Sequence, residues 1–101
     1  MEATEVAGIG EVVVRALKLS ERARFYVAEA EVAEISDKDE RAERSMRLKA
    51  ERLARCVLYA DHSPVYSAEQ WEAFGNLPEF IRLDDVVLRL SGTPADEAAK
   101  K

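Results

Sequence analysis

The chain has 101 residues, of which 48% are hydrophobic and 35% are charged, and its formal net charge is −5. This length and composition predict one folded domain and exclude an intrinsically disordered chain. The acidic balance argues against general nucleic-acid binding, which needs a basic surface. The single cysteine excludes an internal disulfide and a zinc site built from cysteines.

Targeting signals are missing from the sequence. It has no run of about 18 apolar residues that could cross a bilayer. Its first residues, MEATEVAGIGE, lack the basic and apolar regions of a secretory signal. We therefore expect no membrane association and a location inside the cell that makes the protein.

The N-terminal segment is expected to contain little regular structure. Residues 1–10 are small, acidic and interrupted by glycine, and we expect them to form a flexible arm. Residues 11–17 read EVVVRAL, and the three consecutive valines favour a short strand. The only candidate partner for this strand is the region around Pro64–Tyr66, so any ribbon would depend on the helices for stability.

A first helix is expected from Ser20, a good N-cap, to about Ile35. Its apolar residues form two stripes, one of Ala23, Tyr26, Val27 and Ala30 and one of Phe25, Ala28, Val32 and Ile35. Two stripes indicate either a helix sandwiched between neighbours or a helix with one side kept for a partner. The sandwich is our expectation, and the partner side is the alternative.

A second helix is expected to begin after Asp37, with Glu40 at capping-box spacing, and to reach about Ala60. Its apolar residues recur at steps of 4, 4, 3, 4 and 3, close to a heptad seam: Ala42, Met46, Ala50, Leu53, Val57 and Ala60. The opposite side carries a basic stripe of Lys38, Arg41, Arg44, Arg52 and Arg55. The stripe is either a solvated face or a docking face.

Charge is distributed unevenly along the chain. Residues 38–55 hold seven basic and four acidic residues, whereas residues 61–99 hold two basic and eight acidic residues. Such segments can attract each other within one chain or between subunits. We expect self-association in which the acidic C-terminal half of one copy meets Arg41, Arg44, Arg52 and Arg55 of another.

Two further helices are predicted after a turn at Asp61–Pro64. Ser67 caps the first of them, with Gln70 at capping-box spacing, and Gly75 ends it. Asn76 caps the last helix, which is amphipathic and closes at Ser91-Gly92.

The last helix contains one carboxylate in an unfavourable place. Asp84 lies inside the apolar arc, so its side chain needs a partner if it is buried. Asp85 follows it directly, and neighbouring residues on a helix point about 100° apart, so the two do not form a catalytic pair. We expect a flexible tail at residues 93–101.

The sequence contains no recognisable catalytic or cofactor motif. It has no glycine-rich phosphate loop and no metal-ligand cluster. His62 is expected to be an exposed turn residue, and Cys56 a small packed residue. We therefore expect no enzyme activity, no cofactor and no metal.

The expected fold class is mainly α, with about four helices in a small single domain and an optional short N-terminal β-strand. The expected domain organisation is an arm at 1–10, one helical domain at 11–92 and a tail at 93–101.

The segment from Ala50 to Gly92 contains RLARCVL at 52–58, DHSPVY at 61–66, the capped helix at 67–74 and DDVVLRLSG at 84–92. With these parts in this order, it resembles the tail assembly chaperones of long-tailed, non-contractile phages. Residues 12–17, VVVRAL, are similar to the N-terminal segment of that family. The turn at 61–64 differs, because it is shorter than the family's Asp-x-x-Gly turn and lacks glycine.

The resemblance implies a protein that binds the tape measure protein in the cytoplasm of the bacterial host. It would keep this client soluble during tail tube assembly, could meet the major tail protein, and would be absent from the mature virion. The family commonly makes a second, longer form by ribosomal frameshifting, with which this chain would associate. The codons of Lys100-Lys101 are a candidate slippery site.

Exposed apolar side chains are what a client-binding protein needs, and the large aromatic ones are also the usual choice for a small core. The candidate partner-binding residues are Val65, Tyr66, Trp71, Phe74 and Phe25. Two rival functions remain: a small helical DNA-binding or regulatory adaptor that uses the basic stripe, and a structural or connector protein of the virion.

Overall fold

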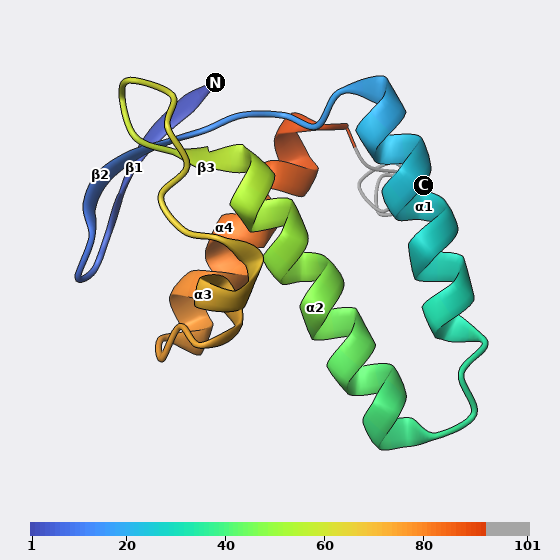
Figure 1. Ribbon diagram of the computed structural model, residues 1–101. Coiled ribbons are helices and arrows are strands. Elements are labelled where there is room, and N and C mark those ends of the chain that lie inside the picture. Colours follow the sequence, from blue (N-terminus) through green and yellow to red (C-terminus); the bar gives the residue numbers. More distant parts are fainter. Residues whose placement is uncertain (93–101) are drawn as a thin grey trace.

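A computed structural model describes residues 1–92, and the predicted tail at 93–101 lies outside the described residues. Four helices make this part of the chain mainly α, as expected, and three short strands form a sheet at one end. The elements follow the order β1 (Glu2–Val6), β2 (Gly10–Val14), α1 (Leu19–Ala33), α2 (Lys38–Cys56), β3 (Val57–Leu58), α3 (Ala68–Glu72) and α4 (Leu77–Leu90). Figure 1 shows α2 in the middle, with α1 along one side and α3 and α4 on the other.

The N-terminal residues form a β-hairpin, so the flexible arm predicted at 1–10 is wrong. Strands β1 and β2 pair antiparallel from Glu2 opposite Val14 to Val6 opposite Gly10. Gly8 and Gly10 have positive φ angles of 86° and 104°, a conformation that glycine adopts without steric cost. The hairpin buries Val6 and Val12 in the core, which is why this segment is ordered.

The predicted strand at 11–17 is present as β2, but its partners differ from the expectation. Besides β1, it pairs antiparallel with β3, where Val13 lies opposite Leu58 and Val14 opposite Val57. The predicted partner region contributes only an isolated bridge between Pro64 and Leu58. Helix α2 therefore ends at Cys56, short of the expected Ala60, because Val57 and Leu58 leave the helix to complete the sheet.

Three of the four predicted capping residues set the starts of their helices, whereas α1 begins at Leu19 with Lys18 as its N-cap, so the prediction of Ser20 as a cap is wrong. The side chain of Asp37 accepts hydrogen bonds from the backbone of Asp39 and Glu40 at the start of α2. Ser67 and Gln70 exchange the reciprocal bonds of a capping box at α3, and Asn76 caps α4. Each cap satisfies backbone N–H groups that a helix leaves without partners in its first turn.

Helix α1 is not sandwiched between neighbours, so the expectation drawn from its two apolar stripes is wrong. Phe25 is the only residue of the helix that is fully buried. The stripe that contains Tyr26 and Val27 is exposed within the described part of the chain. The core therefore lies between α2, α4, α3 and the sheet, where Leu53, Leu83 and Trp71 are the largest fully buried side chains.

Val6 tests whether the N-terminal hairpin belongs to the core. Its side chain is buried, so Val6→Ala should lower the free energy of unfolding by about 2 kcal/mol through lost burial and a residual cavity. The neighbouring change Glu5→Ala, at an exposed side chain, should cost less than about 0.5 kcal/mol. Urea unfolding of both variants makes the comparison. Equal unfolding midpoints would support the original prediction of a flexible arm at residues 1–10.

Candidate functional site

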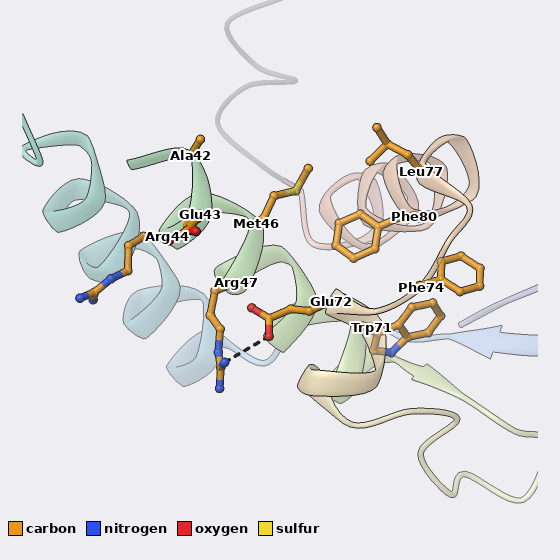
Figure 2. A pocket seen from close by; sticks show the side chains of 10 residues that line it. All are labelled: Ala42, Glu43, Arg44, Met46, Arg47, Trp71, Glu72, Phe74, Leu77 and Phe80. Carbon is orange, nitrogen blue, oxygen red and sulfur yellow. Dashed lines mark hydrogen bonds and ion pairs between the residues drawn. The ribbon is translucent and has the colours of Figure 1, made fainter. Parts of the chain in front are cut away.

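An open groove lies between the N-terminal half of α2 and the end of α3 with the start of α4 (Figure 2). Its volume is about 610 Å³, and more of its accessible lining is apolar than polar. The lining residues come from three helices and the α3–α4 connection: Ala42, Glu43, Arg44, Met46, Arg47, Trp71, Glu72, Phe74, Leu77 and Phe80.

Aromatic rings form the inner wall of the groove. Trp71 and Phe80 are buried, with ring centroids 6.5 Å apart and the rings near perpendicular. Phe74 is half-buried and meets Trp71 edge-on at 5.1 Å, and Tyr66 meets Trp71 edge-on at 5.0 Å. Edge-to-face contacts of this kind are favourable and fix the ring orientations. The wall is therefore a preformed surface.

The outer edge of the groove exposes aliphatic side chains. Met46 on α2 is 39% exposed and Leu77 at the start of α4 is 51% exposed. Figure 2 shows their side chains beside the ring of Phe80. Met46 is a flexible, polarisable side chain that adapts to irregular apolar partners. These two residues are the accessible apolar contacts that a ligand in the groove would meet first.

Ion pairs lie along one edge of the groove. The guanidinium of Arg47 contacts the carboxylate of Glu72 at 3.1 Å and that of Glu51 at 3.6 Å. The Arg47–Glu72 pair joins α2 to α3 across the groove wall (Figure 2). An exposed pair of this kind adds little to stability, but it places both signs of charge beside the apolar surface.

The predicted partner-binding residues separate into two groups. Trp71 and Phe74 line the groove, and Tyr66 packs behind them. Trp71 is itself buried and supports the wall, so Phe74 is the more accessible of the two. Val65 and Phe25 lie outside this groove, and their side chains are also buried.

Sequence reasoning missed the exposed edge of the groove. Met46 belongs to the apolar seam and was expected to pack, but the seam extends beyond the helices that cover it. Leu77 gave no signal of its own, because a leucine in the first turn of an amphipathic helix is ordinary.

The predicted role of Arg52 in self-association is corrected by the structure. Arg52 is buried, and its Nε and Nη2 donate to the two carboxylate oxygens of Asp84 at 2.9 and 3.0 Å. Its Nη1 also contacts Glu29 of α1, and its guanidinium lies over the ring of Phe25. The partner that Asp84 requires when buried is thus Arg52, and this attraction between the basic middle and the acidic C-terminal part acts inside the chain.

The other arginines of the predicted self-association surface are more accessible. Arg55 contacts the carboxylate of Glu21 at 3.2 Å and lies over Phe25. Arg41 and Arg44 are exposed, and Arg41 donates to the backbone carbonyl of Ile35. The basic stripe is therefore shorter than the sequence suggested.

Cys56 and His62, the two side chains that could act as a nucleophile or a base, are not arranged for catalysis. Cys56 is fully buried, and burial raises the pKa of its thiol to about 11, so the thiol stays protonated at neutral pH. His62 is exposed in the turn before β-bridge residue Pro64 and adopts a left-handed φ of 70°.

Residues 1–92 contain no group of three or more His, Cys, Asp or Glu side chains arranged to hold a metal ion. None of the helices in that range combines the length and apolar character needed to cross a bilayer. Comparisons with protein-family models, curated proteins and solved structures find no significant match to the chain.

Removing the partner of Arg52 should destabilise the fold strongly. Asp84→Asn leaves a buried guanidinium without its bidentate acceptor, and we expect a loss of about 3–5 kcal/mol in the free energy of unfolding. The adjacent exposed change Asp85→Asn is the matched control and should cost less than about 0.5 kcal/mol. In a double variant, Arg52→Met with Asp84→Leu, much of the lost stability should return, because no buried charge is left. Unfolding in urea measures all three, and a mild Asp84→Asn would contradict the buried pair.

Because of Glu21, the free energy of unfolding should fall at acidic pH. Hydrogen bonds from Arg15, with further bonds from Lys18 and Arg55, hold the pKa of Glu21 down at about 2. A carboxylate with a lowered folded-state pKa contributes stability above its ordinary pKa of about 4.5, and that contribution is lost as pH falls towards about 2. Wild type should therefore lose more stability than Glu21→Gln between pH 5 and pH 2 in thermal melts. Glu31→Gln, at an exposed position, should follow wild type.

Proposed function

We propose that this protein is a phage tail assembly chaperone that holds apolar helical segments of the tape measure protein in the groove between α2, α3 and α4. The observation that carries the proposal is the groove itself, with its aromatic wall of Trp71, Phe74 and Phe80 and its exposed edge of Met46 and Leu77. The resemblance of Ala50–Gly92 to that family supplies the identity of the client.

The shape of the groove suits a helix better than a small molecule. The groove is open, so nothing encloses a ligand, and its charged lining residues are Glu43, Arg44 and Arg47 on α2 with Glu72 on α3. An amphipathic helix can lay its apolar residues against such a surface and keep its polar face in water. A chaperone also has to release its client, and a shallow groove with half-exposed contacts favours weak binding.

The proposal includes the biological setting that the resemblance implies. The protein would act in the cytoplasm of the bacterial host, leave before the virion is complete, and meet the major tail protein as the tube forms. A longer frameshifted form would share the groove. No catalytic step is part of the proposal, since binding alone prevents aggregation of the client.

The rival functions predict different partners. A DNA-binding adaptor would need the basic stripe, but Arg52 is paired with Asp84 and Arg55 contacts Glu21, which leaves Lys38, Arg41 and Arg44 as the exposed cations of the stripe outside an ion pair in residues 1–92. A gel shift that falls steeply with salt would favour this rival. A connector protein would be found in purified particles, from which a chaperone should be missing.

Groove variants test the proposal directly. Met46→Glu and Leu77→Glu place a carboxylate at the apolar contact, and each should weaken binding of a tape measure fragment at least about tenfold, because the charge would be buried without a partner. Tyr59→Glu, at another half-exposed apolar side chain outside the groove lining, is the matched control and should bind normally.

Binding is read from the fluorescence anisotropy of a dye-labelled fragment. The intrinsic fluorescence of Trp71 is a poor readout, because this tryptophan, the only one in the chain, is 1% exposed in the groove wall. The fragment should come from the tape measure protein encoded in the same tail gene cluster. Absence of binding by wild type, or equal binding by the groove variants, would contradict the proposal.

A further inference from the structure

Among the three long helices, α1 contributes the fewest buried side chains. It buries Phe25 alone, whereas α2 buries four residues and α4 buries five. Tyr26 and Val27 are exposed, and Val32 is half-buried. Because burial of apolar area is the main term that stabilises a fold, α1 is held by weaker packing than α2 or α4.

Hollows separate α1 from its neighbours. Two of them, of about 480 and 360 Å³, lie between α1 and α2, and a third of about 420 Å³ lies between α1 and the end of α4. Val32 of α1 and Leu48 of α2 line both of the first two hollows. The apolar contact between the two helices is therefore narrow here, with unfilled space on either side of it.

Much of the remaining attachment of α1 is polar and reached by water. Three contacts join it to other elements: Glu21 to Arg55 at 3.2 Å, Glu29 to Arg52, and Arg22 to the backbone carbonyl of Gly92 at 3.1 Å. The side chains of Glu29 and Arg55 are 54% and 43% exposed. Ion pairs with an exposed partner are weak, and dissolved salt screens them further.

Both ends of this segment are fastened independently of α1. Before the helix, Leu17 is buried and its backbone N–H donates to the hydroxyl of Ser91 at 3.0 Å. After it, Asp37 caps α2. An isolated helix of 15 residues is marginal in water, so α1 should lose its helical hydrogen bonds once it leaves α2 and α4. The rest of the fold keeps its own core when that happens.

We propose that residues 18–36 form a strap that opens by local unfolding while the sheet, α2, α3 and α4 stay folded, and that ionic strength sets the balance between the closed and open forms. Opening uncovers Phe25 and the guanidinium of Arg52. Arg52 keeps Asp84 as its bidentate partner in the open form, so the buried pair need not break. The strap is separate from the groove, whose lining includes no residue of α1.

Amide hydrogen exchange of the full chain, followed by NMR, tests the strap. Amides at 24–33 should exchange at least about 100-fold faster than those of Leu53 and Leu83, because local opening is more frequent than global unfolding. Raising the salt concentration from about 0.02 to 0.5 M should speed exchange at 24–33 by about threefold, since the ion pairs are screened.

Two variants separate local opening from global unfolding. Val6→Ala weakens the core in the closed and open forms alike, so it should speed exchange at Leu53 and Leu83 by about thirtyfold and leave residues 24–33 unchanged. Glu29→Gln destabilises only the closed form and should speed exchange at 24–33 by about two- to fivefold. Glu72→Gln, which breaks the exposed pair with Arg47 between α2 and α3, is the matched control and should leave that exchange as in wild type.

Three results would each overturn the proposal. The first is equal protection of α1 and of the core amides in wild type. The second is a Val6→Ala variant in which residues 24–33 accelerate as much as Leu53 and Leu83, because α1 would then exchange only through global unfolding. The third is exchange at 24–33 that neither salt nor Glu29→Gln changes.

Discussion

A buried ion pair between Arg52 and Asp84 sets the arrangement of the helices. Moving two charges out of water costs several kcal/mol for each, and the cost is offset only when the geometry is close to ideal and the remaining hydrogen bonds are made. Here the guanidinium meets both carboxylate oxygens, and its third nitrogen reaches Glu29. The requirement for this geometry fixes how α2 lies against α4, because a small rotation of either helix would separate the planar groups. We regard this as a source of specificity more than of net stability.

The same arginine explains why α1 is attached by its inner side alone. Phe25 is the single buried side chain of α1, and it lies beneath the guanidinium groups of Arg52 and Arg55. Contacts of Glu21 and Glu29 with arginines complete the attachment. A helix held by one aromatic ring and several ion pairs does not need a second neighbour, so Tyr26 and Val27 remain exposed.

Local signals in the sequence were sufficient for much of the helical structure. Asp37, Ser67 and Asn76 start their helices as predicted, because a cap acts on backbone groups within three residues. Long-range pairing could not be predicted in the same way. Strand β1 reads EATEV, which has no run of β-branched residues, and its order depends on pairing with β2, on burial of Val6 and on contacts from Arg82 of α4. Likewise Arg52 looked like part of an exposed stripe, since its partner Asp84 is 32 residues away.

The groove exists because the apolar seam of α2 is longer than the helices that pack against it, and the sequence of one helix alone does not show this. The apolar seam of α2 begins at Ala42, but α3 and the start of α4 are too short to cover it, and full burial within the helix begins at Ala50. Met46 is left half-exposed beside the aromatic wall. In a chain with a longer α3 these side chains would be ordinary core, and the groove would be filled. Because α3 has only five residues, the apolar surface remains available, and this excess over what the fold itself needs is the physical argument for a binding role.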